Sequence, residues 1–209
     1  MTKELELAKL LREMANDALL PLHESRLVFG EGDPDAEVML IGEAPGFYED
    51  LEGKPFVGRA GKLLDKLIEE ADHQRQEFYI TNIVKRRPPN NRDPLPEEIG
   101  AYKPYLEKQI DIIAPKIIIA LGRYAMNYFL PEGKISRDQG KIFWWQNALL
   151  MPLYHPAAAL RRADLVNDIL GGLKKISALT AEYETLLQKR EPHTEDSHPR
   201  TKEQPQLFS

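Results

Sequence analysis

The sequence predicts an α/β protein: a central, mostly parallel four-stranded sheet covered by helices on both faces, a three-layer α/β/α sandwich. Four short apolar runs have the character of buried parallel strands, at residues 38–41, 78–83, 117–121 and 149–153. Helical patterns lie between these runs. Alternation of this kind places ligand sites at the carboxyl ends of the strands.

The expected helices lie before, between and after the strands. Residues 4–19 place leucines and Met14 at helical spacing, until Pro21 ends the pattern. Three more helices are expected, at residues 59–71, 96–114 and 123–130. A last helix, about residues 164–187, should close a single domain of residues 1–189. The polar segment 190–209 has few apolar anchors and is expected to be disordered.

Composition sets limits on the class of protein. With 209 residues, 42% of them hydrophobic, the chain can bury a sizeable core. It contains no apolar run approaching the roughly 20 residues of a membrane span, and its N-terminus lacks a secretion-signal pattern, so we expect a cytoplasmic protein without membrane contact. The sequence has 0 cysteines, which excludes disulfides and thiolate ligands.

The net charge of −5 does not exclude a nucleic-acid partner. Residues 1–37 hold nine acidic and four basic residues, which accounts for the whole excess, and the rest of the chain is balanced. Basic residues cluster there, in Lys85, Arg86 and Arg87 and in the pair Arg161 and Arg162. They predict a phosphate-binding face, with solvated surface patches as the alternative.

Polar side chains begin at three predicted strand ends. Gly-Glu-Ala-Pro-Gly occupies 42–46, Ile-Thr-Asn-Ile-Val-Lys occupies 80–85, and Tyr-His-Pro occupies 154–156, followed by Leu-Arg-Arg at 160–162. A carboxylate, an amide and an imidazole should therefore meet at one edge of the sheet. Together such groups can read and expel a base that has been taken out of DNA.

These segments, with Gly-Lys-Pro-Phe-Val-Gly at 53–58 and Arg-Pro-Pro-Asn-Asn-Arg-Asp-Pro at 87–94, resemble family 4 uracil-DNA glycosylases. The resemblance covers the chain from about Phe29 to Lys175. It implies the uracil-DNA glycosylase fold and a monofunctional enzyme of base-excision repair. Such an enzyme cleaves the N-glycosidic bond of uracil and leaves an abasic site, with no metal in the chemistry. A nucleoid-associated monomer is expected.

The resemblance assigns Ala44, Phe56 and Asn82 to the uracil pocket. Phe56 would stack on the base, and an ordinary core phenylalanine is the alternative. The Asn82 amide offers one donor and one acceptor, which match O4 and N3–H of uracil but not the edge of cytosine. A strand-end asparagine that caps a turn is the alternative for Asn82.

Glu43, His155 and Glu49 are the expected catalytic residues. His155 would face O2 of the departing base, where negative charge develops, although a histidine before Pro156 can also be a turn residue. Related families place an aspartate at the position of Ala44, so Glu43 is the first candidate to orient the water. Glu49 is expected to crowd C5 of uracil, where thymine carries a methyl group.

DNA contacts are expected from one set of residues: Lys85, Arg87, Arg92, Leu160, Arg161 and Arg162. Leu160 and Arg161 stand where the family inserts a side chain into the hole left by the flipped base, although Leu160 could also belong to a helix core. Related covalent DNA binders carry a histidine in the loop after the asparagine motif. Residues 85–94 contain none, so turnover is expected.

Typical family members hold a 4Fe–4S cluster through four cysteines. This sequence has Ala15, Ala18, Arg86 and Ala101 at those positions, so we expect no cluster and no other cofactor. Side-chain packing should replace this staple. Arg86 is expected to hold its loop through an acidic partner such as Asp17 or Glu24.

The sequence leaves two other classes of function open. A non-catalytic binder of uracil-containing or damaged DNA would use the same scaffold. A nucleotide-binding protein is suggested by Gly-Arg-Ala-Gly-Lys at 58–62, but Leu63 replaces the hydroxyl residue that a P-loop needs. The segment from Gln204 to Phe208 resembles a sliding-clamp docking motif, with a casual apolar terminus as the alternative.

Overall fold

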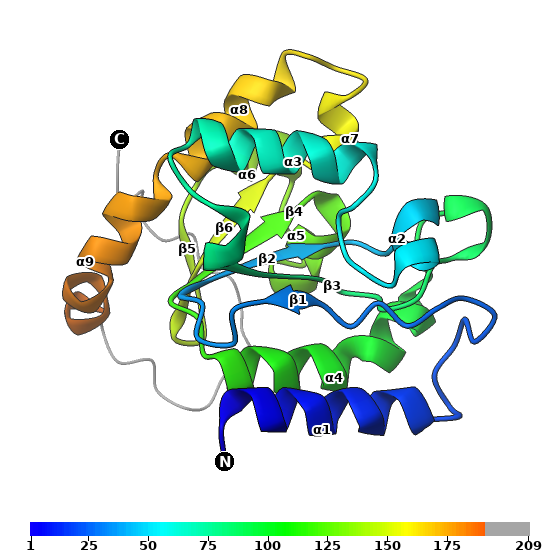
Figure 1. Cartoon of the computed structure of the whole chain (residues 1–209). Coiled ribbons are helices and arrows are strands. Elements are labelled where there is room, and N and C mark those ends of the chain that lie inside the picture. Colours follow the sequence, from blue (N-terminus) through cyan, green and yellow to red (C-terminus); the bar gives the residue numbers. More distant parts are fainter. Residues whose placement is uncertain (191–209) are drawn as a thin grey trace.

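The computed structural model describes residues 1–190, and its centre is one six-stranded sheet in the order β1-β3-β2-β4-β6-β5 (Figure 1). The strands are β1 (Glu31–Gly32), β2 (Val38–Gly42), β3 (Phe78–Asn82), β4 (Ile117–Leu121), β5 (Phe143–Trp145) and β6 (Ala148–Leu153). The four predicted strands are all present as the parallel strands β2, β3, β4 and β6. The short strands β1 and β5 extend this sheet with antiparallel pairing at its two edges.

Helices cover both faces of the sheet, as predicted. They are α1 (Lys3–Asn16), α2 (Phe47–Glu52), α3 (Arg59–Glu70), α4 (Pro96–Ile113), α5 (Arg123–Phe129), α6 (Ile135–Asp138), α7 (Pro156–Ala159), α8 (Leu165–Leu173) and α9 (Ile176–Lys189), with 3₁₀ turns η1 (Arg75–Glu77) and η2 (Pro89–Asn91). Figure 1 shows α1 and α4 side by side on one face and α3 on the other.

The single helix expected over residues 164–187 was wrong. The segment forms two helices, α8 and α9, with Lys174 and Lys175 between them. The apolar residues of α8 pack on β6 and those of α9 on β4, and Figure 1 shows the two helices running in different directions. The change of direction lets each helix bury its own apolar side.

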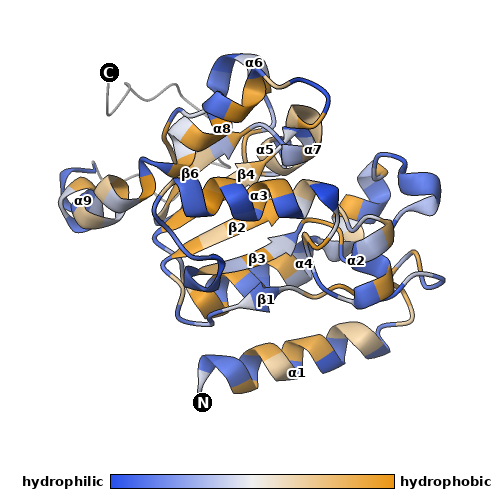
Figure 2. Ribbon diagram, turned by 45° about the horizontal axis from the view of Figure 1, so that its top comes forward, coloured by the Kyte–Doolittle hydropathy of each residue, from blue (hydrophilic) through white to orange (hydrophobic). Residues whose placement is uncertain are grey.

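Alternate residues of the strands build two cores. Met39 and Ile41 of β2 pack with the buried side chains of α1, α4 and α5. Val38 and Leu40 pack with those of α3, α8 and α9. This is the pattern of strands buried on both faces, and Figure 2 shows β2 mostly in hydrophobic colours at the centre of the molecule.

The register of the sheet aligns the carboxyl ends of the parallel strands. Gly42 pairs with Asn82 across β2 and β3, and Leu121 pairs with Leu153 across β4 and β6. The loops that follow these strands therefore leave the sheet at one edge. Within residues 1–190, no helix is both long and apolar enough to cross a membrane.

Candidate active site

Gly42 sits beneath two of the predicted site residues. A Cβ at position 42 would lie 2.4 Å from Oδ1 of Asn82 and 2.5 Å from the ring of Phe56. Any larger residue would displace one of them. The absence of a side chain at Gly42 thus lets the Asn82 amide and the Phe56 ring meet at the end of β2.

Asn82 ends β3 and is only 2% exposed. Its Oδ1 atom is buried and accepts no hydrogen bond from the residues that the structure describes. A buried acceptor without a donor costs free energy of about 1–3 kcal/mol, and native proteins leave few of them. The Asn82 Oδ1 atom is therefore available to a ligand that brings an N–H or O–H group.

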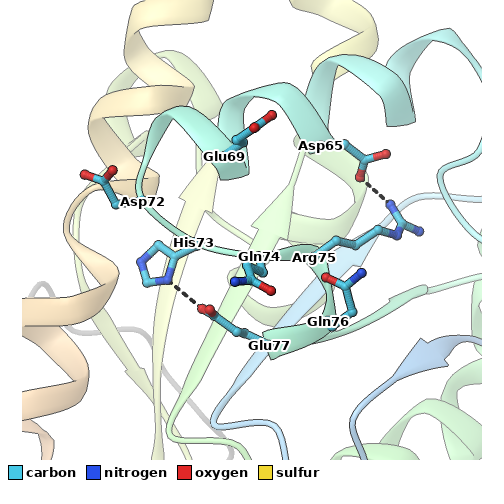
Figure 3. Close-up of a pocket in the computed structure, with 8 residues that line it drawn as sticks. All are labelled: Asp65, Glu69, Asp72, His73, Gln74, Arg75, Gln76 and Glu77. Atoms are coloured by element: carbon cyan, nitrogen blue, oxygen red, sulfur yellow. Dashed lines mark hydrogen bonds and ion pairs between the residues drawn. The ribbon is translucent and has the colours of Figure 1, made fainter.

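Phe56 lies on the loop between α2 and α3 with a backbone φ of 53°, in the left-handed region that non-glycine residues rarely adopt. Arg75 supports this loop through its guanidinium, which donates to the carbonyl oxygens of Pro55 at 2.7 Å and Phe56 at 3.4 Å. The same guanidinium pairs with Asp65 at 2.7 Å and Glu31 at 3.0 Å. Figure 3 shows the Arg75 side chain directed toward Asp65, beside a surface hollow of about 550 Å³.

Glu49 of α2 supports the same loop by accepting hydrogen bonds from two backbone N–H groups of the loop. Its Oε1 atom accepts hydrogen bonds from the backbone of Val57 at 3.1 Å and of Gly58 at 2.9 Å. The loop is therefore held by Arg75 at the carbonyls of Pro55 and Phe56 and by Glu49 at the N–H groups of the two residues that follow Phe56. The contact of Glu49 with C5 of uracil stays a prediction.

His155 follows β6 and caps the first turn of α7, where its Nδ1 atom accepts from the backbone N–H of Ala157 at 3.1 Å. Its ring stacks near that of Phe56, with centroids 5.6 Å apart and planes inclined by 27°. Burial, reinforced by the charge of Arg161, lowers the pKa of His155 to about 4. At neutral pH the ring is uncharged, and since Nδ1 is an acceptor, the proton lies on Nε2.

Glu43 follows Gly42 at the same edge. Burial and, to a lesser degree, the negative charge of Asp93 raise the pKa of its carboxyl to about 7, against the opposing effect of Arg123. Near neutral pH the side chain thus exists in both protonation states, which suits a group that orients and deprotonates water. Ala44, the next residue, is partly buried against the core.

Three residues near Glu43 were not anticipated: Asp93, Arg123 and Tyr124. The Tyr124 hydroxyl donates to Oδ2 of Asp93 at 2.5 Å, and Arg123 lies 3.4 Å from the same oxygen. The Arg123 guanidinium also lies 4.5 Å above the Tyr124 ring. Asp93 belongs to the 87–94 segment that the sequence singled out, but only the fold brings α5 beside it.

Lys85 cannot contact DNA, so its assignment to the DNA-binding face was wrong. The residue is 0% exposed, and its Nζ atom donates to Thr81 at 2.6 Å and to Gln109 of α4 at 2.5 Å. Burial lowers the pKa of Lys85 well below its ordinary value. It belongs to a polar network inside the core, where Gln109 also donates to the Phe29 carbonyl at 3.0 Å.

The other predicted DNA-binding residues lie at the surface and differ in whether an ion pair holds their side chains. Arg92 forms an ion pair with Glu98 at 2.6 Å, and Arg162 pairs with Asp164 at 2.5 Å. Arg161 is exposed and forms no ion pair within residues 1–190. Leu160 is 43% exposed directly after α7, which excludes a place in a helix core.

Arg87 pairs more loosely. It lies 3.8 Å from Asp50, and its Nε atom donates to Asn91 at 2.6 Å.

The positions of the family's cluster ligands do not fit an iron–sulfur cluster. Alanine has no donor atom, and Arg86 brings a cation where a thiolate would be needed. Arg86 donates to the carbonyl of Ser25 and to the hydroxyl of Tyr102, which itself donates to the Pro21 carbonyl at 2.8 Å.

The expected acidic partner of Arg86 was wrong. Asp17 instead accepts from the Tyr105 hydroxyl at 2.7 Å, and Arg86 forms no ion pair with Glu24 in the described chain. Neutral groups of the N-terminal segment take this role: the Ser25 carbonyl accepts from Arg86, and the Pro21 carbonyl accepts from Tyr102 of α4.

At the carboxyl edge of a parallel sheet, Gly42 leaves room for an amide and an aromatic ring beside a neutral imidazole, and this cluster defines a class of protein. Residues 29–174 match the model of the uracil DNA glycosylase superfamily, and the chain belongs to this superfamily.

Among its relatives, the type-4 uracil-DNA glycosylase of Saccharolobus solfataricus is 52% identical over 168 residues, which cover 75% of this chain and 78% of the relative. That of Sulfurisphaera tokodaii is 48% identical over 160 residues, or 72% and 73% of the two chains. That of Archaeoglobus fulgidus is 39% identical over 189 residues, or 85% and 95%.

Proposed function

We propose that this chain is a uracil-DNA glycosylase that flips uracil out of DNA and hydrolyses its N-glycosidic bond in base-excision repair. The single observation that carries the assignment to this pocket is the buried, unpaired Oδ1 atom of Asn82 beside the Phe56 ring. Uracil brings an N3–H donor to that acceptor, whereas cytosine brings a second acceptor. One side chain can therefore select the base that is excised.

Bond cleavage needs stabilisation of the departing base. As the bond between C1′ and N1 breaks, its electron pair moves to the base and charge builds on O2. The Nε2–H group of neutral His155 donates to that oxygen, so the hydrogen bond strengthens in the transition state. Because the pKa of His155 is about 4, it acts as a hydrogen-bond donor and keeps its proton.

The sugar left behind is an electron-poor, oxocarbenium-like carbon. The Glu43 carboxylate stabilises this charge and accepts a proton from the attacking water, whose oxygen forms the new bond to C1′. The products are free uracil, after it takes up a proton, and an abasic site. Arg75 and Glu49 hold the Phe56 platform on which the base lies.

The direct test is a single-turnover assay with a uracil-containing oligonucleotide in the presence of EDTA. Release of free uracil is expected, with an abasic site in the DNA. The alternative, a non-catalytic binder of uracil-containing or damaged DNA, predicts a stable complex without release and would replace this proposal if no uracil appeared.

The domain is also proposed to fold and act without a cofactor. Two observations support it. The sequence contains no cysteine, and Arg86, which stands at the position of a cluster ligand, instead donates a hydrogen bond to the neutral carbonyl of Ser25. The domain then owes its order at residues 86–101 to hydrogen bonds and packing.

Leu160 and Arg161 are proposed to enter the duplex where the base has left. An exposed apolar side chain on a short turn offsets part of the unstacking cost, and Arg161 brings a cation to the adjacent phosphates. Arg162, Arg87 and Arg92 would add phosphate contacts by exchanging their present carboxylate partners. We also propose a monomer that works in the cytoplasm at the nucleoid.

The tail motif from Gln204 to Phe208 lies outside the described residues. It is proposed to dock on a sliding clamp through Leu207 and Phe208. A peptide of residues 199–209 should bind a bacterial clamp with a Kd of about 1 μM. Replacing Leu207 and Phe208 by alanine should abolish binding, and an intact tail that does not bind the cognate clamp would remove this partner.

A further inference from the structure

Helix α2 carries exposed aromatic side chains beside the loop that holds Phe56. Phe47 is 53% exposed and Tyr48 is 52% exposed, and their rings meet edge to face with centroids 5.4 Å apart. None of the residues of α2 is buried. Large aromatic surfaces left open to water in this way indicate a binding surface when they lie beside a functional site.

The position of the pair is fixed by the Phe56 loop. Tyr48 lies next to Gly58, where a Cβ would come within 3.5 Å of its ring. Glu49, the next residue of α2, accepts the hydrogen bonds from Val57 and Gly58 that hold this loop. The exposed rings are therefore continuous with the platform proposed for the excised base.

The charge beside the rings suits a nucleic acid. The Arg87 guanidinium lies 5.1 Å from the centre of the Phe47 ring. It also lies 3.8 Å from the Asp50 carboxylate, a loose ion pair that a phosphate can replace. Aromatic rings next to arginine are the usual means of binding unpaired bases, since stacking holds the base and the cation meets its phosphate.

The size of the surface also favours a base over a protein. Aromatic residues bury about 150–250 Å² each, so this pair falls far below the roughly 1,200 Å² of a stable protein interface. A single nucleobase needs no larger area.

We propose that Phe47 and Tyr48, with Arg87, form a second base-binding site that stacks an unpaired base adjacent to the excised uracil in single-stranded DNA. The proposal rests on the proposed function, because the neighbouring pocket must receive the uracil. In a duplex the adjacent bases are already stacked and paired, so this site should favour single strands over duplexes.

The test uses the full chain and a non-cleavable 2′-fluoro-arabino-uridine strand, so that binding is measured apart from excision. One strand carries bases on both sides of the uridine, and a matched strand carries tetrahydrofuran abasic residues there. The wild-type chain should bind the base-containing strand about tenfold more tightly. A combined Phe47→Leu and Tyr48→Leu variant should bind the two strands equally.

Two controls sharpen the result. The swap Phe47→Tyr with Tyr48→Phe keeps both rings and should keep the difference between the strands. Leu51→Ala removes another exposed apolar side chain of α2, 61% exposed, and should also leave it unchanged. A 2-aminopurine next to the uridine should be quenched by the wild-type chain and not by the leucine variant.

Equal binding of both strands by the wild-type chain would overturn the proposal, as would an unchanged difference in the leucine variant. Self-association that only the leucine variant loses would also overturn it, in favour of a contact between copies. If no uracil is released from a normal substrate while the strand difference persists, the proposed function fails and the second base site stands.

Discussion

At the scale of single residues, the two polar groups proposed to face the base can be tested by alanine substitutions that should leave the overall fold intact. Asn82→Ala and His155→Ala should each slow uracil release by at least about tenfold, because each removes a polar contact of roughly 1–3 kcal/mol. Single-turnover rates and thermal unfolding of the same preparations measure this. Parent rates in both variants would show that the base lies elsewhere.

The rate of release should depend on the ionisation of Glu43. Its carboxylate accepts the water proton, so activity should rise with pH through an apparent pKa of about 7 and then level off. Glu43→Gln should lower the rate and remove this rise. His155, with a pKa of about 4, should contribute no transition in the same range. A flat profile from about pH 5.5 to about 8.5 would contradict the role of Glu43.

The free energy of unfolding should change with pH in the direction opposite to activity, which provides a control. The folded state raises the pKa of Glu43 above its value of 4.5, so the folded protein holds this proton more tightly than the unfolded chain. Ionisation of Glu43 should therefore reduce the free energy of unfolding as pH rises from 4.5 to about 7. Glu43→Gln should lose that pH dependence while it loses activity.

At the scale of elements, the loop that carries Phe56 depends on η1. Arg75→Ala should lower kcat/KM by about tenfold or more, because the Pro55 and Phe56 carbonyls lose the donor that positions the stacking ring. Arg75→Lys should restore part of the activity. Steady-state kinetics that separate kcat from KM provide the measurement.

Asp65→Asn is the matched control for Arg75. It removes the ion pair between Asp65 and Arg75 but leaves the bonds to the loop carbonyls. Activity close to the parent is expected. Equal losses in Arg75→Ala and Asp65→Asn would show that only the ion pair matters.

The sequence predicted the elements whose signal is local. The four parallel strands are continuous apolar runs, and α3, α4 and α5 follow them within a residue or two of the expected bounds. The edge strands β1 and β5 escaped because two and three residues carry no periodicity. The break before α9 was not predicted, although Gly171 and Gly172 lie just before it; α8 continues through both glycines to Leu173, and the two helices then pack on different strands.

The grouping of candidate site residues could be predicted where side chains follow strand ends, but not where tertiary contacts decide, and the roles of these residues stay predictions. Asn82 and Phe56 meet over Gly42, and His155 lies beside Phe56, as the motifs suggested. Lys85 was misassigned because a lysine before two arginines is typical of a surface cluster. In the structure it lies in the core, where it donates to Gln109 of a helix distant in sequence. Arg75 belongs to none of the motifs, so no local signal connects it with Phe56.

At the scale of the whole molecule, DNA affinity should depend on a small number of cations. Arg161→Ala combined with Arg162→Ala should reduce the slope of log K against log salt by about two, since each lost phosphate contact removes about one. Binding titrations at several salt concentrations measure the slope. Lys103→Ala with Lys108→Ala removes two charges from α4 and should leave it unchanged. An unaltered slope in the arginine variant would point to Arg87 and Arg92.

The N-terminal helix and the 86–101 loop should hold together without iron. Purified protein is expected to be colourless and to contain no stoichiometric iron, and Arg86→Ala should lower the free energy of unfolding by about 1–3 kcal/mol through loss of its bonds to Ser25 and Tyr102. Iron analysis and denaturant unfolding provide the measurements. A brown preparation with about four irons per chain would contradict the cofactor-free domain.

The hydrogen bond by which His155 caps α7 depends on the protonation state of the same ring that is proposed to donate to the base. Nδ1 can accept from Ala157 only while it is unprotonated, and α7 leads directly into Leu160 and Arg161. When the pH falls below about 4, the ring gains a proton on Nδ1 and the cap is lost together with the neutral donor. The turn that presents the wedge then loses its first anchor, so the grip on DNA should loosen near pH 4, well below the pH of about 7 at which protonation of Glu43 already slows bond cleavage.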